Sequence, residues 1–364
     1  MNRSLRRLAG PALLASLLLL GACSGSSGDG GADGGATEPA AVDTSAVLAE
    51  LADEVIIPGY EELDGRAATL SSALDGLCTT PSAGALDAAR QAWREAISAY
   101  QRTRAGAVGP ADELRLMSAV AFDARPSLID DLLAGTDPVD ADALAGEGAA
   151  VRGLFAIEHA LFGEGSDALA TATAPSRRCE YLAGASLLVH DAASEVAEAW
   201  TVGDARDRFV AGLDGGPDST VAQLLNEVSR RLDTVDTMGL RDLAGASTLE
   251  DLDEDRRDGP AAYGLAQHRA ITEGVTLVLG DGSKGLSVLI VDADADLGRR
   301  VQDARVAAAS TMSALPDAVA DAFADPDAVD AASEAVAALK VLVSTEVASE
   351  LGVTITFSDS DGDA

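Results

Sequence analysis

Histidine is scarce in this sequence. The 364 residues include only His159, His190 and His268, and none of them forms a His-x-x-x-His or His-Glu-x-x-His pattern. Zinc peptidases of the zincin type need two imidazoles on one helix face, so their chemistry has no support here. Each histidine alone is more simply explained as a surface or helix-face residue. There is also no Cys-x-x-Cys-His segment, which excludes haem attachment of the c type.

Basic residues are also few. The chain has 26 Lys and Arg against 60 Asp and Glu, a net charge of −34. A surface of this charge repels nucleic acid and anionic lipid headgroups, so we expect no nucleic-acid partner. The acidic excess could attract cations, although a compositional bias toward Ala, Gly, Asp and Arg explains the total equally well.

A long apolar run occurs only at the N-terminus. Arg3, Arg6 and Arg7 precede an apolar run over residues 8–20, and Leu-Gly-Ala-Cys then ends at Cys23. A basic start, a short apolar run and small residues before a cleavage point are typical of a secretory signal. The run is shorter than the roughly 20 residues of a membrane-spanning helix. Its ending resembles a bacterial lipobox, in which Cys23 would be lipidated.

The sequence after the predicted signal agrees with a lipid anchor. We expect a signal peptide over residues 1–22 and a solvated tether over residues 23–43 that is rich in Gly, Ser, Ala and Asp. Acyl chains such as palmitate on Cys23 would hold the exported protein at the outer face of the bacterial cell membrane. An ordinary signal with a chance cysteine is the alternative.

Cysteine is as rare as histidine. If Cys23 is lipidated, only Cys78 and Cys179 remain, and in an exported chain such a pair is expected to form a disulfide. The closed loop of about 100 residues corresponds to roughly 4.7 kcal/mol of chain entropy. A pair of free buried thiols is the alternative.

Helical periodicity dominates the mature region. Apolar stripes at three- and four-residue spacing predict helices, among them 86–100, 182–200 and 329–351. Pro58 is expected to kink or break the first helix. Alternation typical of a strand occurs only at 353–357.

These stripes predict an all-α protein. The Gly-, Pro- and Asp-rich break at 201–217 suggests two halves resembling four-helix bundles, an N-terminal half over 44–202 and a C-terminal half over 203–364. A single continuous helical array is the alternative.

Several local patterns, in order along the chain, resemble the imelysin-like family. They are Val55 to Tyr60, Ala92-Trp93 with the turn at Gly109-Pro110, the helix Arg152 to Gly163, Cys78 with Arg178 to Leu182, and the ending Leu351 to Asp363. The resemblance extends from about residue 45 to residue 364. It implies exported proteins built of two helical bundles, some described as insulin-cleaving membrane proteases and others belonging to iron or haem uptake systems.

The family hallmark is Gly-x-His-x-x-Glu, proposed as a metal-binding or catalytic element. Gly153 and Glu158 match it, but Phe155 stands where the histidine would be. His159 cannot replace that histidine, since it lies about 100° from Glu158 around the helix. The chain therefore resembles a divergent branch, and the metallopeptidase interpretation loses much of its support.

Glu158 is the most informative candidate site residue. It shares a helix face with Phe155 and Phe162, where a carboxylate is costly unless it is paired or hydrogen-bonded. One interpretation is a ligand or metal contact, with His159 and Arg152 as additional ligand-binding candidates. The other is a structural carboxylate that pairs with Arg125 or Arg152 or accepts backbone N–H bonds.

Three functions follow. The first is a non-enzymatic cell-surface lipoprotein that binds a ligand between the two halves; by family analogy the ligand is iron, another divalent metal or a metal complex, passed to a transporter partner. The second is a metallopeptidase, and the third is a structural or protein-docking lipoprotein. The metallopeptidase predicts chelator-sensitive cleavage. The docking protein predicts that Glu158 is part of a buried ion pair.

Overall fold

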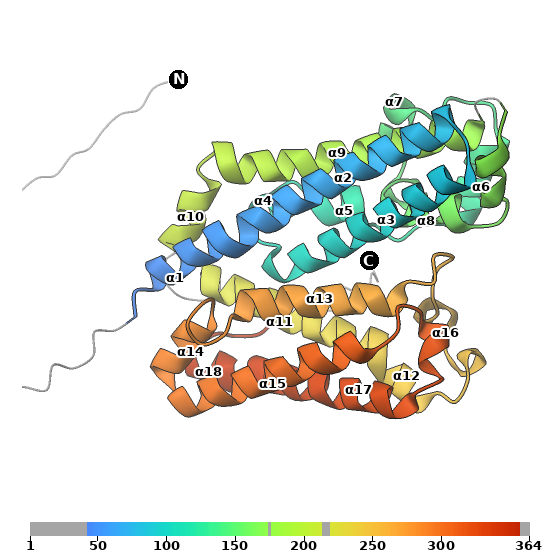
Figure 1. Ribbon diagram of the computed structural model, residues 1–364. Helices are drawn as coiled ribbons and strands as arrows, with labels where there is room; N and C mark the ends of the chain where they lie inside the picture. Colours follow the sequence, from blue (N-terminus) through green and yellow to red (C-terminus); the bar gives the residue numbers. More distant parts are fainter. Residues whose placement is uncertain (1–41, 174–175, 213–218, 357–364) are drawn as a thin grey trace, which may run out of the picture. The chain divides into compact units, whose positions relative to one another are not determined.

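The computed structural model describes residues 42–173, 176–212 and 219–356, and these contain helices and no strand (Figure 1). The all-α prediction is confirmed. The predicted signal peptide, Cys23 and nearly all of the tether lie outside the described residues. Residues 353–356 form no strand; the amide of Thr356 donates to Asn226 Oδ1 (2.7 Å) and Asn226 Nδ2 donates to Thr354 O (3.3 Å). The strand-like alternation at 353–357 thus corresponds to no strand in the described residues, because a side-chain amide supplies these backbone partners.

The N-terminal helices, blue to green in Figure 1, form one packed set. They are α1 (Thr44–Leu51), α2 (Ile57–Thr79), α3 (Ala83–Thr103), α4 (Pro110–Glu113), α5 (Leu116–Val120), α6 (Pro126–Ala134), α7 (Ala141–Ala145), α8 (Leu154–Phe162), α9 (Arg177–Val202) and α10 (Ala205–Ala211). The long helix α2 packs against both α3 and α9, and α8 packs against α3 and α9. Helix α10 contacts α1 and α9 and so continues this set.

The C-terminal helices, yellow to red in Figure 1, form the second set. They are α11 (Thr220–Asp233), α12 (Arg241–Gly245), α13 (Gly264–Leu279), α14 (Ser287–Ala293), α15 (Ala295–Ala314), α16 (Val319–Ala322), α17 (Pro326–Val341) and α18 (Ala348–Glu350). Helix α15 packs against α13, α14 and α17, and α11 packs against α13 and α17.

The two sets meet mainly where α13 packs against α3. Residues 41–364 form one compact unit by their contacts, so the predicted division at residue 202 stays a prediction. No helix of the described chain is long and apolar enough to cross a membrane.

Capping side chains define several helix starts. Ser82, Ser176, Ser219 and Asp294 each accept a hydrogen bond from a backbone N–H in the first turn of α3, α9, α11 and α15. Such a side-chain oxygen satisfies one of the backbone donors that a helix start leaves free, typically worth about 1 kcal/mol.

Pro58 does not break the first helix. The chain stays helical from Thr44 to Thr79, and a π-helical turn over Ala52–Ile56 lies just before the proline. Proline has no N–H and its ring crowds the carbonyl four residues earlier, and the wider π turn absorbs this irregularity. In place of the expected kink or break, the helix contains one wider, π-helical turn.

The predicted disulfide is confirmed. Cys78 and Cys179 are bonded, with a Cα–Cα distance of 5.6 Å. The bond joins the end of α2 to the beginning of α9. It therefore crosslinks two of the longest helices of the N-terminal set.

Candidate functional site

The signature helix α8 begins at a glycine that no other residue replaces without strain. Gly153 has φ +88°, and a Cβ atom there would lie 2.7 Å from the carbonyl oxygen of Val120. Trp93 Nε1 donates to Leu154 O (2.7 Å), and Tyr181 Oη donates to Val151 O (2.8 Å). These contacts fix the helix start against α3 and α9.

Glu158 lies on the buried face of α8. Its side chain is only 6% exposed, and Oε1 accepts a hydrogen bond from the backbone N–H of Ala261 (3.1 Å). The backbone passes so closely that a Cβ at Gly259 would lie 2.4 Å from Oε1. Ala261 and Gly259 belong to the segment 257–263 that precedes α13, which we call the interface loop. A carboxylate of the N-terminal set thus holds a loop of the C-terminal set.

Burial shifts the titration of the Glu158 carboxyl toward neutral pH. Burial raises the pKa of Glu158 to about 7; the N–H of Ala261 opposes this, and the nearby charge of Asp258 adds to it. Burial also raises the pKa of Asp258, against the opposing effect of backbone N–H groups. Asp258 accepts hydrogen bonds from the amides of Gly264 and Val319, both at 2.7 Å. Asp258 therefore organises the interface loop and α16 and is not free to bind a ligand.

Of the other two predicted ligand-binding residues, neither contacts Glu158. His159 Nε2 lies 2.8 Å from Asp130 Oδ1 on α6. Arg152 Nη1 donates to Ala145 O (3.1 Å). No arginine of the described chain pairs with Glu158, so Ala261 N–H supplies the partner. Phe155, at the position of the family histidine, is partly buried against the core.

An open pocket lies directly beside this contact. Its volume is about 530 Å³, and its lining residues come from both helix sets: Arg90, Arg94, Phe162, Gly163, Glu164, Gly165, Ser166, Asp167, Pro260 and Ala261. We call it the signature cleft. The prediction of a cleft between the halves therefore corresponds to a cavity that borders the Glu158–Ala261 hydrogen bond.

Arginine and aromatic side chains dominate one wall of the signature cleft. The guanidinium of Arg94 lies 5.2 Å from the ring centre of Phe162 and 5.8 Å from that of Tyr263. Arg90 pairs with Asp167 (2.9 Å). Within the described chain Arg94 has these ring contacts and no carboxylate partner. Its planar N–H groups can therefore receive an oxyanion.

A bare metal ion fits this site poorly. Among residues 42–173, 176–212 and 219–356, no group of three or more His, Cys, Asp or Glu side chains could hold a metal. Glu158 is engaged by Ala261, and His159 by Asp130. Glu158 as a single metal ligand stays a prediction.

Sequence reasoning did not identify Arg90, Arg94, Asp258 or Tyr263. The two arginines have a visible signal, since they are four residues apart on α3 and flank the buried Trp93. No local pattern connects the interface loop to α8, because these segments are about a hundred residues apart.

Comparisons with known proteins found one similar sequence and similar solved structures. Iron-regulated protein A of Synechococcus elongatus is 38% identical over 69 residues, 19% of each chain, so the match spans about a fifth of that relative. An imelysin-like protein from Psychrobacter arcticum is 17% identical with a TM-score of 0.67, over 86% of this chain and 97% of its own. A putative iron-regulated protein A precursor from Parabacteroides distasonis is 18% identical with a TM-score of 0.68, over 87% and 97%.

These structures establish the likeness of fold, and the family itself follows from the sequence. Residues 56–345, most of the chain, match the family model described as Imelysin. The chain belongs to the imelysin family.

Proposed function

We propose that this imelysin-family chain is a non-enzymatic binding lipoprotein that takes an iron complex into the signature cleft. It would be exported and held by lipid on Cys23 at the outer face of the bacterial cell membrane. From there it would pass its ligand to a transporter partner. The iron assignment draws on its relatives, one of which is an iron-regulated protein A.

The observation that carries the binding proposal is Arg94. A guanidinium held between two aromatic rings, beside an open pocket and with no carboxylate partner in the described chain, is preorganised for an anion. Free ferric or ferrous ions would be repelled by it. Iron would therefore enter as a complex with an anionic chelator such as citrate, and Glu158 would serve by holding the interface loop that forms one wall.

A metal-loading experiment tests this proposal. The mature chain is prepared with Cys23→Ser, so that it carries no lipid and stays in solution. It is equilibrated with ferric citrate and desalted, and its bound iron is measured by mass spectrometry. We expect bound iron in this protein, loss of it in Arg94→Gln, and retention in Arg102→Gln. Arg102 is the matched control because it lies on the same helix but pairs with Glu62 (2.8 Å) outside the cleft.

The two alternatives give different results in the same experiment. A site for the bare ion would bind iron, zinc, copper or calcium without citrate and lose the metal in Glu158→Ala. Chelator-sensitive cleavage of insulin by the loaded protein would then identify a metallopeptidase. No metal in any form would leave a docking lipoprotein.

The lipid anchor has its own test. Cells grown with a palmitate analogue should label the chain, and Cys23→Ser should abolish the label and release the protein from the membrane fraction. A Cys23→Ser chain that remains in that fraction would contradict anchoring through Cys23.

A further inference from the structure

A second polar cavity lies between the two helix sets, away from the signature cleft. Its volume is about 130 Å³, and its charged and aromatic lining comprises Tyr60, Tyr100, Arg104, Glu227, Arg230 and Arg231. We call it the arginine cavity. It shares Glu227 and Arg230 with an open pocket of about 390 Å³, through which it can be reached from solvent. No residue of it lines the signature cleft.

The arginine side chains of this cavity outnumber the carboxylates that could neutralise them. Glu227 lies 3.0 Å from Arg230 and 3.5 Å from Arg231. Arg104 donates to Gln101 Oε1 (2.9 Å), a neutral acceptor. Three cations thus face one half-buried carboxylate, that of Glu227, with Asp112 exposed at the edge.

Arg231 is the least satisfied of the three. It is 7% exposed, and its Nε is enclosed with no hydrogen-bond partner in the described chain. Burial, followed by the charge of Arg104, lowers the pKa of Arg231 to about 10, so the side chain is still charged at neutral pH. A buried donor without an acceptor is destabilising, and more so when the group is charged.

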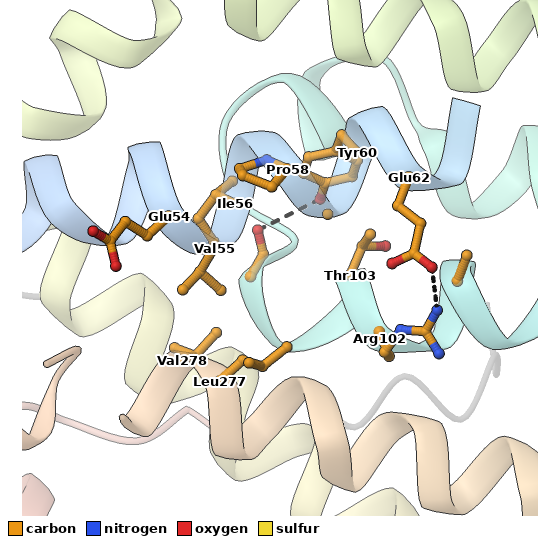
Figure 2. A pocket seen from close by; sticks show the side chains of 13 residues that line it. Glu54, Val55, Ile56, Pro58, Tyr60, Glu62, Arg102, Thr103, Leu277 and Val278 are labelled. Atoms are coloured by element: carbon orange, nitrogen blue, oxygen red, sulfur yellow. Dashed lines mark hydrogen bonds and ion pairs between the residues drawn. The ribbon is translucent and has the colours of Figure 1, made fainter. Parts of the chain in front are cut away.

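A neighbouring pocket shows the usual arrangement for comparison. It has a volume of about 150 Å³ and lies against the same Tyr60 and Thr103, with Val55, Leu277 and Val278 on its walls (Figure 2). Its charged groups have opposite partners: Arg102 pairs with Glu62, and Glu54 pairs with Lys284, both at 2.8 Å. This neighbouring pocket therefore lacks the unbalanced positive charge of the arginine cavity.

Tyrosine hydroxyls add to the donors there. Burial raises the pKa of both Tyr60 and Tyr100, so both phenols keep their protons. Tyr60 Oη donates to Gly106 O at a long 3.4 Å, and a dashed line from the labelled Tyr60 marks this bond in Figure 2. The cavity thus offers N–H and O–H donors, with Glu227 as the competing carboxylate inside it and Asp112 at its exposed edge.

We propose that the arginine cavity is a binding site for a small oxyanion, the carboxylate or phosphate group of a ligand, received by Arg231 and Arg104. Planar guanidiniums bind such groups through paired N–H donors. The chain carries a net charge of −34, so an anion enters only where local positive charge outweighs that field. The proposal does not depend on the function of the signature cleft.

Calorimetric titration of the mature Cys23→Ser chain tests it, with inorganic phosphate in one arm and acetate in the other. Sodium chloride at equal ionic strength is the reference. We expect saturable binding in at least one arm, and the stronger arm identifies the ligand class. Arg104→Gln and Arg231→Met should each weaken binding at least tenfold. Arg206→Gln, which removes a half-buried arginine that lies outside the cavity and pairs with Asp53, should not change it.

If Arg231→Met fails to fold, the Glu227→Gln variant provides a second test of the proposal. Removing the competing carboxylate should tighten anion binding several-fold, an effect that loss of stability cannot imitate. No saturable heat in either arm would overturn the proposal. So would binding that survives Arg104→Gln, or binding that Glu227→Gln leaves unchanged.

Discussion

The carboxylate of Glu158 accepts a hydrogen bond from the amide of Ala261, 103 residues further along the chain. This hydrogen bond connects the signature helix to the interface loop, and no arginine in the described chain pairs with Glu158. Glu158 thus performs a structural task, because it holds the interface loop against α8.

The first prediction concerns Glu158 and pH. Its pKa is raised to about 7 in the folded chain, against 4.5 when unfolded. Between these values the folded state keeps a proton that the unfolded state has lost, so this residue lowers stability as pH rises. Glu158→Gln should remove the effect and gain up to about 3 kcal/mol over the wild type by pH 8. Urea unfolding at pH 4 to 8 measures it, and parallel profiles for the two proteins would contradict it.

His268 should act in the opposite direction. Burial, with the charges of Arg104 and Arg256, lowers its pKa to about 4 from the ordinary 6.5. Its Nδ1 is enclosed without a hydrogen-bond partner in the described chain. As pH falls from 6.5 to 4, His268 therefore becomes protonated in the unfolded state before it does so in the folded state. The free energy of unfolding decreases over this range, by at most about 3 kcal/mol.

His268→Gln should abolish this acid-side loss. Because Glu158 and His268 oppose each other over nearly the same pH range, the wild type should show a weaker pH dependence than either single variant. The double variant, measured by the same urea series, should return to a weak dependence. A single-variant profile as flat as that of the wild type would show that the residue titrates normally.

Much of the fold could be predicted from the sequence, because local apolar spacing determines where the helices form. The stripes at 182–200 and 329–351 correspond to α9 and to the run from α17 through α18. The disulfide followed from counting the cysteines that remain after Cys23. Pro58 was harder, because whether a proline breaks a helix depends on whether the preceding turn can widen.

The candidate site could be predicted only in part. Gly153 and Glu158 are identified by their spacing, yet the partner of Glu158 is a backbone amide, which no side-chain pattern encodes. Arg94 acquires its role from Tyr263, which reaches it only through tertiary packing of the interface loop. The contacts that sequence reasoning missed are those that join the two helix sets.

The disulfide should contribute measurably to stability. Cys78 and Cys179 close a loop of 101 residues, and removing such a crosslink typically costs about 2–4 kcal/mol. Cys78→Ser with Cys179→Ser should lower the free energy of unfolding by that amount, and the urea midpoint should fall with it. Reducing agent should destabilise the Cys23→Ser protein similarly and leave the triple variant unchanged. Equal midpoints for the oxidised and disulfide-free proteins would contradict this.

The start of the signature helix should tolerate no side chain. Gly153→Ala forces a Cβ to within 2.7 Å of Val120 O at φ +88°, a conformation that costs an L-residue about 1–3 kcal/mol before the clash is counted. Gly65→Ala is the matched control, since Gly65 lies inside α2 with nothing within 4 Å of its Cβ position. That change should stabilise the protein by about 0.5–1 kcal/mol. If thermal unfolding shifts the two variants in the same direction, the backbone at Gly153 is not held as described, and α8 would not be fixed by its glycine.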